Sequence, residues 1–174
     1  MVAIVEGAVL ETVDWGASVA GREADYDARF GLVRSRLLGI CAGLVGADRA
    51  EDAVQDAYLA GRARYDRLRD LQAFEAWVIR IAVNRCMDEH RRDRRLVEIS
   101  PRTDGRAAPG RDVGLRELVE RLPARERTIV VLHYGHGYRL EEIGLLLRLS
   151  HTNVRTILSR GRLRLLRGLR ESTP

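Results

Sequence analysis

The segment LEEIGLLLRLSHTNVRTILSRGRLRLLRGL, residues 140–169, decides how the rest of the chain is interpreted. It predicts two short helices separated by a tight break at Leu149–Ser150, with Ser150 suited to cap the second helix. No acidic residue stands between His151 and Arg170, and the arginines of this second helix are Arg155, Arg160, Arg162, Arg164, Arg167 and Arg170. An amphipathic helix, a turn and a basic helix are typical of a helix-turn-helix, which places its second helix in the major groove of DNA.

The overall charge agrees with a polyanionic partner without proving one. The 174 residues carry a formal net charge of +5, and all 30 basic residues are arginine. A mild positive charge is also common among cytosolic proteins, and the absence of lysine fits a GC-rich coding sequence equally well. The charge therefore supports DNA binding only in combination with the helix-turn-helix.

The cysteines and histidines do not indicate a metal site. Cys41 and Cys86 are far apart in the sequence, stand among apolar neighbours and form no CxxC pair, so we expect buried, reduced thiols. His133 and His136 are three residues apart, but no nearby carboxylate or thiol accompanies them. We therefore expect neither a metal nor another cofactor.

Membrane segments and catalytic motifs are not visible in the sequence. No apolar run approaches the roughly 18 residues that a membrane span needs, and the partly apolar start of the chain lacks the basic region of a signal peptide. We expect a cytoplasmic protein without membrane insertion. No glycine-rich phosphate loop and no Ser/His/Asp or Cys/His motif is present, so an enzyme is not expected.

The apolar pattern predicts an all-α protein with two small helical domains joined by a flexible linker. Residues 1–24 are expected to form a mobile N-terminal tail, with an inhibitory or docking segment as the alternative. The first domain is assigned to residues 25–96 and the second to residues 115–171. Residues 97–114 are rich in proline and glycine and lack periodicity, so they are assigned to the linker.

Three helices are expected in the first domain. The first begins near Asp25 and ends at Gly46, and its expected core residues are Phe30, Val33, Leu37, Ile40, Cys41 and Leu44. The second runs over about residues 49–65, with Asp48 as its N-cap and Glu51 completing a capping box. Its buried face is expected at Ala53, Val54, Ala57 and Tyr58.

The third helix is expected from about Ala73 to Arg92, after a loop over residues 65–72. Its core face is expected at Phe74, Trp77, Val78, Ile81 and Ala82, and its polar face at Arg80, Asn84, Asp88 and Arg91. In the second domain a short helix from Leu115 stops at Pro123, and Pro123 begins the next helix, residues 124–134.

Three runs of the sequence are specific enough to compare with a known family. They are DRAEDAVQDAYLAGRARY (48–65), AFEAWVIRIAVNRCMDEHRRDRR (73–95) and LPARERTIVVLHYGHGYRLEEIGLLLRLSHTNVRTILSRGRLRL (122–165). Together they resemble the extracytoplasmic-function (ECF) sigma factors of bacteria. The resemblance implies a dissociable subunit of bacterial core RNA polymerase, in which region two opens the −10 element of promoter DNA and region four reads the −35 element.

The resemblance also implies a docking surface for core RNA polymerase on the second helix. The residues that match this surface are Glu51, Asp52, Gln55 and Asp56. The alternative is an exposed charged helix face without a partner. Sigma factors of this group are commonly held by an anti-sigma factor, so such a partner is expected as well.

A surface for the −10 element is implied on the third helix and the loop before it. The residues expected to contact this DNA are Arg67, Arg69, Arg80, Asn84, Arg91 and Arg92. The loop is where the family captures an unstacked base. Phe74 and Trp77 are expected in the core rather than as stacking platforms. The basic run His90–Arg95 is either a phosphate-binding patch or a solvated helix end.

A surface for the −35 element is implied on the second helix of the helix-turn-helix. Its residues are Ser150, His151, Thr152, Asn153, Arg155, Thr156, Ser159, Arg160 and Arg162. Among them Asn153 and Arg155 are the expected readers of base edges. Ile157 stands where the family commonly has arginine, and this departure puts one phosphate contact in doubt. Thr152 and Asn153 replace the usual Gly-Thr, so the promoter preference of relatives does not transfer.

Two alternatives remain from other classes of protein. A free-standing helix-turn-helix regulator with an effector domain would not need the first two of the three runs. An adaptor that binds polymerase without DNA is disfavoured by the recognition helix, which carries arginines and no acidic residue.

Overall fold

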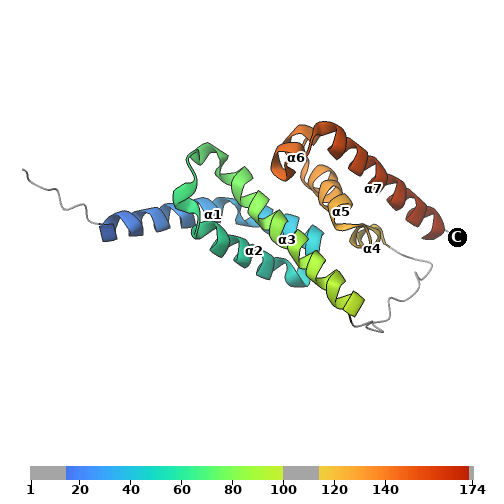
Figure 1. The fold of residues 1–174 in the computed structure, drawn as a ribbon, viewed down its shortest axis with the longest axis horizontal. Helices are drawn as coiled ribbons and strands as arrows, with labels where there is room; N and C mark the ends of the chain where they lie inside the picture. Colours follow the sequence, from blue (N-terminus) through green and yellow to red (C-terminus); the bar gives the residue numbers. More distant parts are fainter. Residues whose placement is uncertain (1–14, 100–113, 173–174) are drawn as a thin grey trace, which may run out of the picture.

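The described chain is helical and forms two units that lie side by side (Figure 1). The structure is a computed structural model that describes residues 15–99 and 114–172, with side chains placed for residues 21–92 and 114–172. The first unit consists of α1 (Trp15–Val45), α2 (Ala47–Arg62), the 3₁₀ turns η1 (Tyr65–Arg67) and η2 (Leu71–Ala73), and α3 (Phe74–Ile99). The second consists of α4 (Leu115–Glu120), α5 (Ala124–Val130), the π-turn η3 (Val131–Gly135), α6 (Leu140–Leu147) and α7 (His151–Ser172). The all-α class is confirmed.

Helix α1 packs against both α2 and α3 and begins earlier than expected. It starts at Trp15 rather than near Asp25, because its early turns carry no apolar stripe that the sequence pattern could reveal. Two ion pairs attach these turns to the end of α2 and to η1: Glu23 with Arg62 at 2.7 Å and Arg22 with Asp66 at 3.4 Å. The end of α1 agrees with the prediction, because Gly46 follows it with a φ of 91°.

The expected core of α1 is confirmed. Phe30, Leu37, Ile40, Cys41 and Leu44 are buried. Val33 is only partly buried and packs against the same cluster.

Helix α2 differs from its expected bounds at both ends. It begins at Ala47 without a side-chain cap, so the predicted N-cap at Asp48 is wrong. Asp48 lies inside the first turn, where its negative charge still favours the helix N-terminus. The helix ends at Arg62, and Tyr65 instead begins η1 as a buried residue. The predicted buried residues Ala53, Val54 and Ala57 are confirmed.

Helix α3 is longer than expected and is buried on more than one side. It continues past Arg92 to Ile99. Its buried residues are Phe74, Val78, Ile79, Ala82, Val83 and Cys86. The predicted core residues Trp77 and Ile81 are only partly buried. The difference arises because α3 packs against α1 and α2 and also against α5 and α6, so its buried face is not a single stripe.

Helices α6 and α7 form the expected helix-turn-helix. Arg148 ends α6 in the left-handed region with a φ of 55°, and the Leu149 N–H donates to the Gly144 carbonyl at 2.9 Å. A Cβ on Gly144 would lie 2.9 Å from the Leu149 carbonyl oxygen, so the tight break requires glycine there. Upstream, Pro123 precedes α5 as expected, while α5 gives way at Val131 to the π-turn η3.

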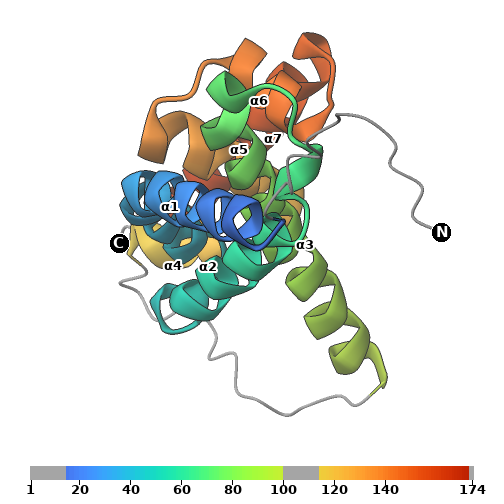
Figure 2. The same cartoon turned by 90° about the vertical axis from the view of Figure 1, so that its left-hand side faces the viewer.

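The two units pack on each other at a face of α1 that carries glycines in place of larger side chains. A Cβ on Gly43 would lie 2.7 Å from Val131 Cγ1, and one on Gly39 would lie 3.0 Å from His136 Cε1. Residues four apart share one face of a helix. Gly39 and Gly43 therefore give α1 a flat face on which the segment around η3 packs. The buried apolar side chains of both units form one continuous cluster, and Figure 2 shows α5, α6 and α7 lying over the first unit.

A buried arginine adds polar contacts between the units. Arg127 of α5 donates from Nη1 to the Leu44 carbonyl at 2.7 Å, and the same nitrogen lies 2.9 Å from His90 Nε2. His90 Nε2 also lies 2.8 Å from the Leu44 carbonyl oxygen. Both interpretations of the run His90–Arg95 are therefore wrong for His90, because its ring contacts the second unit.

The remaining expectations concern the N-terminal tail, the linker, membrane-spanning segments and the two cysteines. Of the expected tail, residues 1–24, residues 1–14 lie outside the described residues and the rest belongs to α1; of the expected linker, residues 97–114, residues 100–113 lie outside them and residues 97–99 belong to α3. Of the helices that the structure describes, none is both long and apolar enough to cross a membrane. Cys41 and Cys86 are buried free thiols, as predicted.

Candidate DNA and polymerase interfaces

The first turns of α7 present all the predicted −35 residues on one exposed surface. These residues are Ser150, His151, Thr152, Asn153, Arg155, Thr156, Ser159, Arg160 and Arg162. Ser150 is the N-cap, since its Oγ accepts the Asn153 N–H at 3.3 Å. Val154 and Leu158 are buried, and their contacts hold the helix with its polar side outward.

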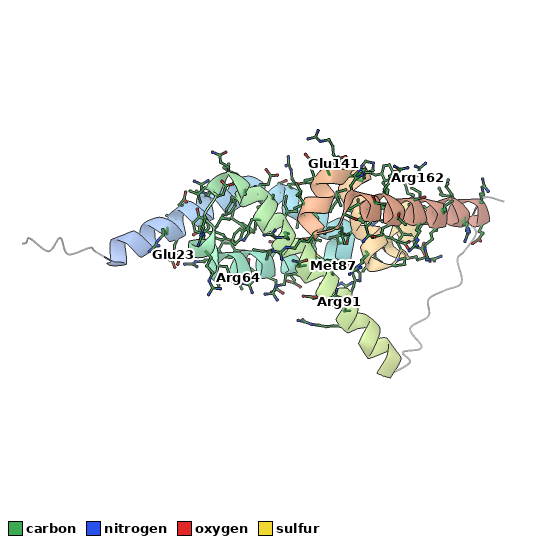
Figure 3. All side chains as sticks on the ribbon, turned by 45° about the horizontal axis from the view of Figure 1, so that its top comes forward. Glu23, Arg64, Met87, Arg91, Glu141 and Arg162 are labelled. Atoms are coloured by element: carbon green, nitrogen blue, oxygen red, sulfur yellow. The ribbon has the colours of Figure 1, made fainter. Side chains whose placement is uncertain are left out.

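The arginines on this surface are not neutralised within the described chain, whereas His151 Nε2 lies 3.2 Å from Oε1 of Glu141. Arg155, Arg160 and Arg162 form no ion pair among the described residues, and Figure 3 shows Arg162 on the outer side of α7. By contrast, Arg164 Nε lies 2.9 Å from Oε2 of the buried Glu126. The arginines of α7 therefore divide into free surface charges and one that is held by α5.

A groove of about 810 Å³ lies along this surface and has one wall from η3. His133 and Tyr134 line it beside Arg155 and Ser159. The Tyr134 side chain is 57% exposed, and its ring meets the His133 ring with centroids 4.7 Å apart. Neither residue is among the predicted −35 residues, because both precede the helix-turn-helix and only the turn at η3 brings them beside α7.

Ile157 faces the interior rather than the exposed side of α7 that carries the predicted −35 residues. Its side chain is 9% exposed and belongs to the continuous apolar cluster. An isoleucine at this position contributes an apolar contact to the unit. Its effect is therefore on packing, and not on the surface that carries Arg155 and Arg160.

The predicted polymerase-binding residues lie together on the outer face of α2. Glu51, Asp52, Gln55 and Asp56 are all exposed. Glu51 forms an ion pair with Arg34 of α1. Within the described residues Asp52 and Asp56 have no such partner, so they are the unneutralised charges of this face.

The predicted −10 residues follow α3 and the loop before it without forming a single patch. Arg67 and Arg69 are exposed in the loop, and Asn84, Arg91 and Arg92 are exposed along the helix. Arg80 and Arg91 are about 16 Å apart along the axis at 1.5 Å per residue. Arg91 also pairs with Asp88 at 3.2 Å. Figure 3 shows Arg91 beyond Met87 on α3, far from Arg64 at the other end of the unit.

Arg80 is only partly exposed and lies beside the second unit. A cleft of about 580 Å³ separates the units here and is lined by Trp77 and Arg80 of α3 and by Tyr138 and Leu145 of the second unit. Leu145 is 79% exposed. In this arrangement α6 lies next to Arg80 of the predicted −10 surface.

Comparison with known proteins matches each unit to a known region. The family model described as Sigma-70 region 2 matches residues 30–96, and the model described as Sigma-70, region 4 matches residues 113–165. The ECF RNA polymerase sigma factor SigM of Mycobacterium tuberculosis is 31% identical over 131 residues, which cover 70% of this chain. The match spans 64% of SigM, just under two thirds of its length. The ECF RNA polymerase sigma factor SigW of Bacillus subtilis is 26% identical over 174 residues, covering 86% of this chain and 93% of SigW.

Two solved structures share the fold of this chain. RpoE of Bartonella quintana, in complex with the anti-sigma factor NepR, has a TM-score of 0.68 and 22% identity, covering 84% of this chain and 97% of RpoE. CnrH, in complex with the cytosolic domain of CnrY, has a TM-score of 0.58 and 23% identity, covering 87% of this chain and 94% of CnrH. Since two family models match in the expected order and the sequence relatives are ECF proteins, this chain belongs to the sigma-70 family, in its ECF group of RNA polymerase sigma factors.

Proposed function

We propose that this protein binds core RNA polymerase and directs promoter-specific transcription initiation by recognising −10 and −35 elements. The observation that carries the proposal is that one chain presents two exposed surfaces of opposite charge. Unpaired arginines lie on an exposed helix-turn-helix in the region-four match, and unpaired carboxylates lie on α2 in the region-two match. The proposal also includes the division of the chain into a first domain, residues 25–96, and a second domain, residues 115–171.

The outer face of α2 is the proposed contact with core RNA polymerase. Asp52 and Asp56 are one helical turn apart, and both are exposed. A basic surface on the polymerase gains from both charges because neither is neutralised in the free protein. Glu51 contributes less because Arg34 already pairs with it, and Gln55 supplies hydrogen bonds on the same face.

Charge reversal tests this docking role directly. The double variant Asp52→Arg with Asp56→Arg is expected to lose holoenzyme assembly, measured by gel filtration with purified bacterial core polymerase. Its helical content, measured by circular dichroism, should not change, since both side chains are in solvent. The control Glu171→Arg reverses an exposed charge on α7 and should assemble normally. Unchanged assembly of the double variant would contradict the docking role.

The two DNA contacts are proposed on separate units. On α7, Asn153 and Arg155 read base edges while Arg160 and Arg162 contact phosphates. The first unit holds the −10 strand through Arg67, Arg69, Arg80, Asn84, Arg91 and Arg92. The proposal includes an opening of the cleft beside Arg80, since α6 partly covers that residue here.

Transcription with purified components decides between this function and that of a free-standing regulator. Core polymerase plus this protein should initiate at defined sites on genomic DNA, and mapping the start sites yields both promoter elements. A free-standing regulator would bind DNA without polymerase and give no new initiation. The absence of new start sites would overturn the proposal.

An anti-sigma factor is the proposed regulatory partner, and the cytoplasm is the proposed place of action. The structurally similar RpoE is solved with the anti-sigma factor NepR. Expression of a tagged copy in the native cells, followed by identification of the captured proteins, tests this part. Capture of core polymerase subunits alone would argue against a dedicated anti-sigma partner.

A further inference from the structure

The loop between α2 and α3 is attached to α1 by a tyrosine–carboxylate contact. Tyr65, the first residue of η1, is 8% exposed. Its hydroxyl donates a hydrogen bond to Oδ2 of Asp25. Both Asp25 oxygens also accept from Arg29 Nε, each at 3.0 Å. A residue 40 positions upstream therefore holds the start of the loop.

The protonation states of this pair favour a strong hydrogen bond. The hydrogen bond from Tyr65, followed by that from Arg29, lowers the pKa of Asp25, so the carboxylate is ionised. Burial, followed by the hydrogen bond to Asp25, raises the pKa of Tyr65, so the phenol keeps its proton. Hydrogen bonds to a charged acceptor are stronger than neutral ones.

Both ends of the loop pack into the same aromatic cluster. The Tyr65 ring meets the Tyr26 ring at 5.2 Å and the Phe74 ring at 5.9 Å, both edge-on. Phe74 begins α3 immediately after the loop. Between these two anchors Arg67 and Arg69 are exposed. The exposed part of the loop is therefore held at both ends by buried side chains.

We propose that Asp25 is a positioning residue, which acts through Tyr65 to hold residues 66–73 in the shape that receives the unpaired −10 base. The inference rests on the proposed function and deepens it at the −10 site. A loop that is already ordered binds more tightly, because less conformational freedom is lost on binding. Asp25 lies outside all three motif runs, and its role follows from the contact alone.

The chain offers a closely matched control for this contact. Tyr58 of α2 donates from its hydroxyl to Asp27 Oδ1 at 2.7 Å, and its ring also belongs to the cluster around Tyr26. Tyr58→Phe and Tyr65→Phe therefore each remove one tyrosine–aspartate hydrogen bond to α1. Only Tyr65 is attached to the loop, so only its variant should affect DNA.

The test measures binding of the holoenzyme to a single-stranded non-template oligonucleotide that carries the −10 sequence recovered by start-site mapping. Tyr65→Phe and Asp25→Asn are each expected to weaken this binding about tenfold, the effect of losing one charge-assisted hydrogen bond. Assembly with core polymerase and binding to −35 duplex should stay at the wild-type level. Amide hydrogen exchange over residues 66–72 should accelerate in both variants, and in Tyr58→Phe it should not.

The controls separate a positioning role from a structural one. Thermal unfolding should shift to lower temperature in both Tyr65→Phe and Tyr58→Phe, while only Tyr65→Phe loses affinity for the strand. Equal losses of affinity, or none for Tyr65→Phe, would overturn the positioning role while the proposed function stands. A wild-type holoenzyme that assembles but binds no −10 strand would overturn the proposed −10 contact itself, and this inference with it.

Discussion

At the scale of single residues, the proposal assigns base recognition and phosphate binding to different arginines of α7. Arg155 lies on the second exposed turn of α7, and Arg160 lies further along the same helix. Arg155→Ala is expected to lose about 1–3 kcal/mol at the preferred −35 sequence and to relax the preference at one base pair. Arg160→Ala should weaken all sequences equally and reduce the salt dependence by about one phosphate contact. Binding of the holoenzyme to a set of −35 variants at several salt concentrations measures both effects. A uniform loss for Arg155→Ala would assign it to phosphate instead.

Ile157 is expected to matter for stability rather than for DNA. Because its side chain is 9% exposed, Ile157→Arg brings a charge into the apolar cluster and should cost about 1–3 kcal/mol of unfolding free energy. Chemical denaturation followed by circular dichroism measures this cost. Thr156→Arg is the control, because the neighbouring Thr156 is exposed and should change stability little. An Ile157→Arg protein with wild-type stability and tighter −35 binding would show that the side chain reaches the DNA.

At the scale of elements, the glycines of α1 decide whether the units pack. Leucine at residue 43 would collide with Val131, since a Cβ alone lies 2.7 Å from its Cγ1. Gly43→Leu is expected to separate the units and raise the radius of gyration measured by small-angle X-ray scattering. Gly31→Leu on the same helix is the control, because nothing lies within 4 Å of a Cβ there. Equal radii for the two variants would mean that the glycine face of α1 is not needed for packing.

His136 makes the packing of the units sensitive to pH. Burial lowers the pKa of His136 below its ordinary value of 6.5, the contact with the Gly39 backbone opposes this, and Arg36 adds to it. The unfolded chain therefore binds the proton at higher pH than the folded chain does. The stability from burying the neutral imidazole of His136 is complete above pH 6.5 and is lost as the pH falls through the lowered pKa. In denaturation experiments the difference between wild type and His136→Gln should shrink between pH 7.5 and 5.5. A constant difference would contradict this.

At the scale of the whole molecule, we expect the packed arrangement to be too compact to make both proposed promoter contacts at once. The positions in their names place the −10 and −35 elements about 25 base pairs apart, or roughly 85 Å of duplex at 3.4 Å per base pair. α7, with 22 residues, is about 33 Å long, and its unit contacts the first unit directly. We therefore expect the units to separate when both contacts form.

Energy transfer between two dyes measures this separation. The native thiols Cys41 and Cys86 are buried, so Arg64→Cys and Arg167→Cys would provide the reactive sites. Transfer should be high in the free protein and low in the holoenzyme–promoter complex. Equal transfer in the two states would mean that the units stay packed during initiation.

The features that could be predicted from the sequence are those that leave a periodic pattern of apolar residues within one helix. Phe30, Leu37 and Ile40 follow a helical period, and the structure buries all three. The start of α1 was missed because the early turns are held by ion pairs such as Glu23 with Arg62, which leave no period. Trp77 is predicted to lie fully in the core. However, α3 also packs against α5 and α6, and the apolar pattern of one helix does not show how many neighbours that helix has.

The sequence by itself determined the helical class, the helix-turn-helix with its exposed arginines, and the family. Each of these depends on residues within a few turns of one another or on a motif run. Only the tertiary structure decided that Arg127 contacts the Leu44 carbonyl across 83 residues and that Tyr65 contacts Asp25 across 40. Such contacts require two helices to meet at a given angle and distance, and no periodicity within either helix specifies that geometry.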